Sequence, residues 1–139
     1  MNSEHRWSLD PQLARDTAAI GDFSLCQVRL MNDANYPWVV LVPRRHNVTE
    51  ITDLAEPDRA QLMREIALTA DALKAETRCE KINIAAIGNV VTQLHVHVVA
   101  RFRKDAAWPK PVWAFAPARA YADAEGEALA AAMRKRLGI

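Results

Sequence analysis

Two histidines separated by a single valine are the residues of this chain best suited to chemistry. Residues 93–99 read Gln-Leu-His-Val-His-Val-Val and hold two of the four histidines. In a strand, side chains two residues apart share a face, so Gln93, His95 and His97 point one way and the intervening apolar side chains the other. Burying three adjacent polar groups costs free energy unless each finds a partner. The pattern indicates either a functional cluster or histidines that hydrogen-bond within the sheet.

Nucleophilic attack on phosphorus is the chemistry that uses every polar residue of this region. A neutral imidazole is a good nucleophile when its other nitrogen is hydrogen-bonded to a carbonyl, which sets the tautomer. A second histidine can donate to a phosphate oxygen. The turn Gly88-Asn89, just upstream, offers backbone N–H groups and an amide side chain to the same phosphate.

A metal site is the alternative that the histidine spacing leaves open. His-x-His on a strand supplies two imidazole ligands to zinc or iron, and a third ligand is required. His5 and His46 are the remaining histidines, and residues 93–102 contain no acidic side chain.

The rest of the chain predicts an α+β fold with a mostly antiparallel sheet around one long helix. Apolar residues spaced by three and four, among them Leu62, Ile66 and Leu73, indicate a helix from Glu56 to about residue 77 that packs on the sheet. Further helices are expected at about 10–20 and 120–137. Strands are expected at 23–30, 38–42, 81–87 and 93–102, the first two forming a hairpin.

Composition limits the class of protein. The 139 residues, without linker or repeat, predict a single domain spanning 1–139. Eighteen basic and 17 acidic residues leave a net charge of +1, so no nucleic acid partner is expected. Two cysteines without a C-x-x-C pair exclude a disulfide framework. Short apolar runs and a polar N-terminus predict a cytoplasmic protein without a membrane segment.

Residues 93–99 resemble the motif of the histidine triad (HIT) superfamily, His-φ-His-φ-His-φ-φ, where φ is apolar. Gln93 stands in place of the first histidine, as in a bacterial branch of the family. Residues 39–46 resemble the family's apolar strand, which ends in proline, a basic pair and histidine. Thr52-Asp53-Leu54 and Lys81-Ile82-Asn83 are similar too. The resemblance covers about residues 23–103, and 104–139 form a C-terminal loop and helix.

The resemblance implies a five-stranded antiparallel sheet with one long central helix and a C-terminal helix, in a subunit that forms homodimers. It implies a nucleotide hydrolase or transferase that cleaves nucleoside phosphoramidates or dinucleoside polyphosphates without a cofactor. His95 matches the family's nucleophile, which forms a covalent nucleotidyl-histidine, and His97 matches the residue that contacts the α-phosphate or the leaving group. Gln93 is expected to alter this activity without abolishing it. Asn89 and Asn83 match phosphate ligands, and Asn32 and Asp33 fall where the family holds the ribose.

Departures from the family pattern keep a second function open. Gln93 removes one imidazole, and Val90 replaces the serine or threonine that many members carry near the leaving group. A nucleotide-binding module with little or no catalysis is therefore the alternative. Trp108 and Trp113 are expected to close the pocket, to pack at a dimer interface, or simply to pack the C-terminal part of the chain against the body. Arg101 is expected either to reach phosphate or to form an ion pair.

Overall fold

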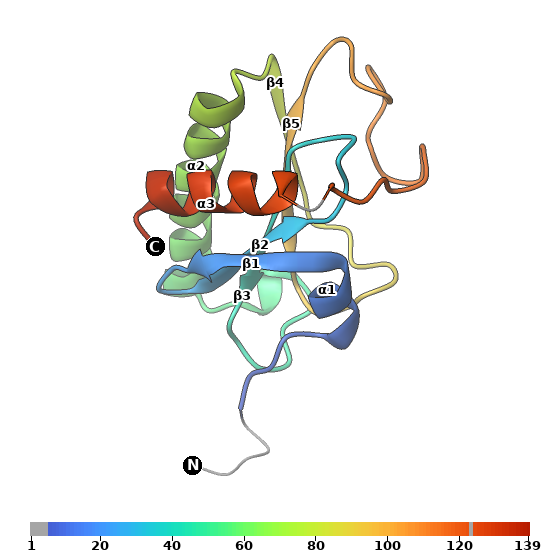
Figure 1. Ribbon diagram of the computed structural model, residues 1–139. Helices are drawn as coiled ribbons and strands as arrows, with labels where there is room; N and C mark the ends of the chain where they lie inside the picture. The colour runs from blue at the N-terminus through green and yellow to red at the C-terminus, as the bar shows by residue number, and fades with distance from the viewer. Residues whose placement is uncertain (1–5, 123) are drawn as a thin grey trace.

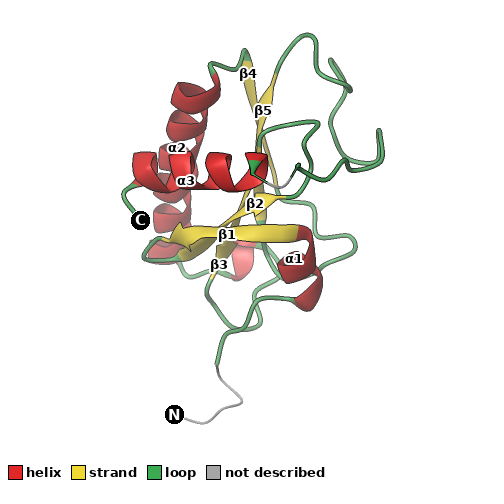
Figure 2. Ribbon diagram, in the orientation of Figure 1, coloured by secondary structure: helices red, strands yellow, loops and turns green. Residues whose placement is uncertain are grey.

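The computed structural model describes residues 6–122 and 124–139, in which five antiparallel strands form one sheet in the order β1-β2-β3-β5-β4 (Figures 1 and 2). The strands are β1 (Thr17–Asp22), β2 (Cys26–Met31), β3 (Trp38–Pro43), β4 (Lys81–Ala85) and β5 (Val96–Arg101). The helices are α1 (Pro11–Asp16), α2 (Glu56–Thr77) and α3 (Glu125–Leu137), with a 3₁₀ turn at Ile51–Asp53. The α+β fold with a long central helix and a C-terminal helix is confirmed.

The helix predicted over residues 10–20 is wrong beyond Asp16. Asp10 caps α1 by accepting from the backbone N–H of Gln12 at 2.8 Å, and Pro11 occupies the first turn. From Thr17 the backbone instead pairs with β2, opposite Met31. Ladder hydrogen bonds to a neighbouring strand therefore override the local helical preference, and residues 17–22 supply the fifth strand of the sheet.

One face of the sheet is covered by α2 and α3, which lie together on the same side (Figure 1). The apolar stripe of α2, which includes Leu62, Ile66 and Leu73, is buried against side chains of β2, β3 and β5. Leu94, Val96 and Val98 belong to this same cluster. The predicted inward orientation of these alternate residues is thus confirmed.

The opposite face is covered by two irregular segments, the N-terminal segment (residues 6–10) and the tail segment (residues 104–122). Their apolar side chains form a second, smaller cluster with residues from β3 and β5. Its fully buried members are Leu13, Tyr36, Trp38, Val40, Val42, Val99, Ala107 and Val112. Irregular chain, together with the short helix α1 through Leu13, thus covers the face that carries the histidines.

Several predicted element ends shift when the strands pair. The last strand begins at Val96 rather than at residue 93, β4 ends at Ala85, and α3 begins at Glu125 rather than at residue 120. Residues 86–95 are therefore a loop that enters β5. The first histidine of the pair lies at the end of this loop, and the second lies in the strand.

Candidate functional site

His95 and His97 lie side by side on the face covered by the N-terminal and tail segments. Their ring centroids are 4.8 Å apart at an interplanar angle of 73°. Both residues are buried, with 7% and 5% of their surfaces exposed. The prediction that the two imidazoles share one face is confirmed.

His95 is held by a backbone carbonyl. Its Nδ1 lies 2.7 Å from the carbonyl oxygen of Gln93, and because a carbonyl only accepts, Nδ1 must carry the proton that is donated. The neutral ring then leaves Nε2 with a lone pair. This is the tautomer that nucleophilic attack by Nε2 requires.

His97 is held in the opposite sense by Trp38 of β3. The indole Nε1–H of Trp38 donates to Nδ1 of His97 at 3.0 Å. An indole nitrogen is a donor only, so Nδ1 of His97 must be unprotonated and the proton of the neutral ring sits on Nε2. His97 therefore offers an N–H donor where His95 offers a lone pair.

Aromatic rings shield His97 from water. Trp38 and Trp113 pack edge-on against the imidazole, at centroid distances of 5.5 and 5.3 Å. Burial, with a smaller effect of the neighbouring His95, lowers the pKa of His97 from 6.5 to about 3. His97 is neutral at physiological pH, which agrees with its hydrogen bond from Trp38.

Trp38 was not identified as a site residue from sequence, where it is only the first member of an apolar strand. Val40, two residues further along β3, lies opposite His97 in the sheet, so Trp38 reaches the histidine along the same face. Of the roles expected for Trp113, packing of the tail segment is confirmed, and the ring also lies against His97.

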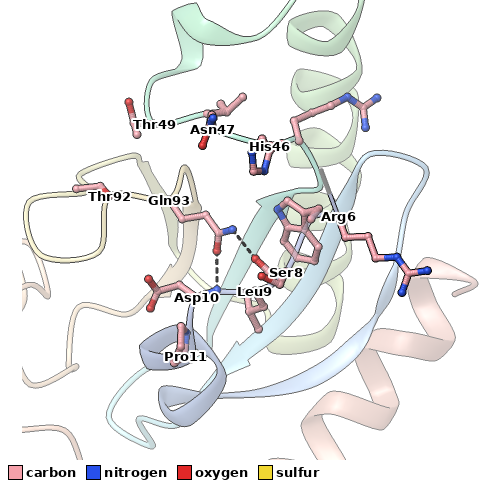
Figure 3. A pocket seen from close by; sticks show the side chains of 13 residues that line it. Arg6, Ser8, Leu9, Asp10, Pro11, His46, Asn47, Thr49, Thr92 and Gln93 are labelled. Atoms are coloured by element: carbon pink, nitrogen blue, oxygen red, sulfur yellow. Dashed lines mark hydrogen bonds between the residues drawn. The ribbon is translucent and has the colours of Figure 1, made fainter. Parts of the chain in front are cut away.

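The side chain of Gln93 points toward the N-terminal segment and binds it (Figure 3). Its amide oxygen accepts from the N–H of Asp10 at 2.8 Å, and its amide nitrogen donates to the carbonyl of Ser8 at 2.9 Å. The side chain anchors the N-terminal segment while the carbonyl of the same residue orients His95.

A cavity of about 340 Å³ lies beside His97 and shares Trp38 and Trp113 with it. Asn32 and Asp33 are on its wall. Both turn residues also hold the tail segment: the Asn32 side-chain oxygen accepts from the N–H of Tyr121, and the Asp33 carboxylate accepts from the N–H of Arg119. The two residues predicted to contact ribose thus line a cavity whose wall includes the two indoles that pack against His97.

The predicted phosphate ligands are less closely grouped. Gly88 has a positive φ of 71° and, like His95, lines a small cavity, whereas Asn89 is exposed in the same loop. Asn83 faces Val99 in the sheet, and its amide oxygen accepts from Arg101 at 2.7 Å. Asn83 therefore lies one pleat further along the sheet than His97.

Arg101 forms the ion pair that was one of its two predicted roles. The buried guanidinium contacts the carboxylate of Asp105 at 2.8 Å and donates to the carbonyl of Lys110. It also packs over the rings of Tyr36 and Trp108. Arg101 thereby anchors the beginning of the tail segment, which carries Trp113 onto His97.

Neither a metal-ligand cluster nor a membrane-spanning helix occurs in the part of the chain that the structure describes. No group of three or more histidine, cysteine or acidic side chains there is arranged to hold a metal ion. His46 is exposed and lines a second cavity, and His5 lies outside the described residues. No helix within residues 6–122 or 124–139 combines the length and the apolar character needed to cross a bilayer.

Comparisons with known proteins agree on one family. A family model described as HIT domain matches residues 12–104. Histidine triad proteins of known structure from Bradyrhizobium japonicum and Sinorhizobium meliloti are 49% and 46% identical, with TM-scores of 0.93 and 0.91. The first match covers 95% of this chain and 98% of the other, and the second covers 94% and 96%. A histidine triad protein from Marinobacter aquaeolei VT8 is 36% identical over 96% of this chain and 97% of its own, with a TM-score of 0.93. A search of curated proteins found no match.

Proposed function

Because this chain belongs to the HIT domain family, we propose that it is an enzyme that binds a nucleotide and cleaves the bond between its α-phosphate and a leaving group. His95 is the nucleophile and carries the nucleotidyl group until water removes it. The observation that supports this most directly is the 2.7 Å hydrogen bond from Nδ1 of His95 to the Gln93 carbonyl, which leaves the Nε2 lone pair for attack.

The Gln93 carbonyl also stabilises the intermediate. When Nε2 bonds to phosphorus, the imidazole becomes a cation that keeps its proton on Nδ1. A carbonyl oxygen 2.7 Å away accepts a stronger, charge-assisted hydrogen bond from that cation than from the neutral ring. The hydrogen bond therefore favours the covalent state over the free enzyme and lowers the barrier to its formation.

His97 supports the same step as a neutral donor. Its Nε2–H is aimed at a phosphate oxygen in the proposed complex, where negative charge grows as the bond to the leaving group breaks. The backbone N–H groups that follow Gly88 and the side chain of Asn89 are the further phosphate ligands. Since the amide oxygen of Asn83 accepts from Arg101, its amide nitrogen is the atom left to donate to phosphate.

The nucleoside occupies the cavity beside His97. A volume of about 340 Å³ is at the lower end of the range of small-molecule sites, and its indole walls suit a flat base. Asn32 and Asp33 are the proposed ribose ligands. The hydrogen bonds from the tail segment orient both side chains. Each side chain keeps a further oxygen lone pair that can accept from a ribose hydroxyl.

The subunit is proposed to form a homodimer through the edge of β4. At the other edge of the sheet, Arg134 of α3 donates to the carbonyl of Ile20 on β1 at 2.7 Å, which blocks pairing there. The β4 edge instead presents Ile84, 51% exposed, and the loop that follows the strand presents Ile87, 43% exposed. Analytical ultracentrifugation should show a dimer for the natural protein and a monomer for Ile84→Asp.

Release of the nucleoside monophosphate is the experiment that tests the proposed activity. AMP formation is measured from diadenosine tetraphosphate and from an adenosine phosphoramidate, with excess chelator present, for the natural protein, His95→Ala and His46→Ala. We expect release by the natural protein and by His46→Ala, which removes an exposed imidazole outside the histidine pair. Full activity of His95→Ala would exclude the proposed nucleophile.

A binding module without catalysis is the second candidate, since the Gln93 amide, which stands in place of the family's first histidine, is engaged by the N-terminal segment (Figure 3). Its signature would be nucleotide-dependent thermal stabilisation without AMP release by the natural protein.

A further inference from the structure

We propose that the leaving group departs from the α-phosphate without receiving a proton from His97, so that the enzyme selects nucleotides whose leaving group is a stable oxyanion, such as a phosphate chain, over those joined to an aliphatic amine. This inference rests on the proposed function and names the substrate class of the same site. Trp38, which acts through His97, is the positioning residue responsible.

The hydrogen bond between Trp38 and His97 prevents His97 from acting as a cationic acid. An imidazolium ion carries protons on both nitrogens, yet Nδ1 of His97 faces the indole N–H of Trp38 at 3.0 Å. Two donors cannot share that position, so protonation of Nδ1 requires this contact to break. While the contact holds, the His97 ring carries one proton, on Nε2. If that proton were transferred, no proton on Nδ1 would keep the ring neutral.

The surroundings of His97 reinforce this restriction. Trp38 and Trp113 pack against the ring, Val40 lies opposite it on β3, and Ala85 lies opposite it on β4. The ionisable group against the ring is His95, whose positive charge in the intermediate further opposes a cation on His97. His97 thus donates a hydrogen bond without transferring its proton, because transfer would leave an imidazolate anion.

The bond changes balance without an acid. The lone pair on Nε2 of His95 forms the bond to phosphorus as the bond to the leaving-group oxygen breaks, and that oxygen departs with the electron pair. Water then attacks phosphorus, the bond from phosphorus to Nε2 breaks, and its electron pair returns to His95. The proton lost by water is released to solution or kept by the nucleoside monophosphate. An alkylamine leaving by the same route would depart as an amide anion, which is far too basic.

Dependence of the rate on leaving-group basicity is the measurement that tests this. AMP release is followed for adenosine 5′-aryl phosphates whose phenols differ in pKa, including the 4-nitrophenyl ester, and for an adenosine 5′-alkylphosphoramidate. If the departing oxygen takes the full charge, kcat/KM should fall by roughly tenfold for each unit by which the phenol pKa rises. A shallow dependence, or an alkylphosphoramidate cleaved as fast as the 4-nitrophenyl ester, would overturn the proposal.

The role of Trp38 is tested by Trp38→Phe, which keeps an aromatic ring and removes the N–H. In this variant Nδ1 of His97 is free to bind a proton. We therefore expect kcat/KM to depend less steeply on the pKa of the leaving group, and to increase most, relative to the natural protein, for the poorest leaving groups. Trp108→Phe is the matched control, since Trp108 packs on Arg101 and its loss should leave the dependence unchanged. An unchanged slope in Trp38→Phe would overturn the role of Trp38.

Nitrogen-15 NMR of the imidazoles of the natural protein gives a readout that needs neither catalysis nor a folded variant. We expect Nδ1 of His97 to be unprotonated and Nε2 protonated, and an imidazolium signal at neutral pH would overturn the proposal. The assay also separates this inference from the proposed function. No release from the 4-nitrophenyl ester would refute the activity itself, whereas release with a shallow slope would refute only the leaving-group preference.

Discussion

The two histidines differ in what holds them, although they are two residues apart and their rings touch. His95 donates from Nδ1 to a carbonyl two residues earlier in the chain. His97 accepts at Nδ1 from an indole 59 residues away. The same side chain is thus held in opposite tautomers, one with a lone pair and one with a proton at Nε2. A nucleophile and a hydrogen-bond donor arise from one residue type, because their partners differ.

The segments behind the two histidines differ as well. On the His95 side, the Gln93 amide binds the N-terminal segment through Ser8 and Asp10 (Figure 3). On the His97 side, the tail segment places Trp113 against the ring and is anchored by Arg101. The His95 side is therefore backed by polar contacts and the His97 side by aromatic ones, and on both sides the covering segment comes from a distant part of the chain.

Loss of the His95 side chain should have the largest effect. His95→Ala removes the nucleophile, and kcat should fall by at least about 10⁴-fold. Nucleotide affinity, measured by calorimetry, should change little, because the proposed base and ribose contacts lie in the cavity beside His97. A kcat of His95→Ala within tenfold of that of the natural protein would contradict the assignment of His95 as the nucleophile and His97 as the donor.

Loss of the His97 side chain should have a smaller effect. His97→Ala removes one hydrogen-bond donor to the transition state, and such losses cost about 10²- to 10³-fold in kcat. His97→Gln retains an N–H donor and should recover part of this loss in a single-turnover assay. Equal losses for the alanine and glutamine variants would argue against a donor role.

Removal of the Gln93 amide should affect stability more than turnover. Gln93→Ala eliminates two hydrogen bonds to the N-terminal segment, at a net cost of about 1–3 kcal/mol in the free energy of unfolding. The carbonyl that orients His95 remains, so kcat should stay within about tenfold. Urea unfolding measures the first effect, and Gln12→Ala, at an exposed site on α1, is the control. A loss of kcat as large as that of His95→Ala would make Gln93 a direct participant.

The pH dependence of stability should also separate His97 from the rest of the site. In the native protein the pKa of His97 is about 3, whereas unfolding restores its usual value of 6.5. Between these values the unfolded state binds one more proton, so this contribution to stability is complete above pH 6.5 and is lost as the pH falls towards 3. The loss is about 1.4 kcal/mol for each pH unit in that window.

Comparison with His97→Gln isolates this contribution from that of the carboxyl groups. Below pH 6.5, the stability measured by thermal unfolding should fall less steeply with decreasing pH for the variant than for the natural protein, since the glutamine amide does not titrate. Parallel curves would mean that His97 is protonated in the native state and that the aromatic enclosure does not exclude its charge.

Much of the fold could be predicted because its signals are local. The apolar stripe of α2 and the alternation along β5 are visible in the sequence, and both have the orientation that this periodicity predicts. The strand β1 was missed because Thr17–Asp22 has no clear alternation, and its partner, β2, supplies the ladder that makes it a strand. Pairing with the neighbouring strand thus decided what the local pattern did not.

The sequence by itself determined that His95 and His97 share a face, because a strand has a period of two residues. That the carbonyl which binds Nδ1 of His95 is that of Gln93 was decided by the structure, in which residue 95 ends a loop. Only the tertiary structure decided that Trp38 sets the tautomer of His97, that the amide of Gln93 turns to the N-terminal segment, and that Asn83 pairs with Arg101. Each of these contacts joins residues far apart in the chain, and no local pattern records which donor and acceptor will meet once the strands pair and the irregular segments cover the sheet.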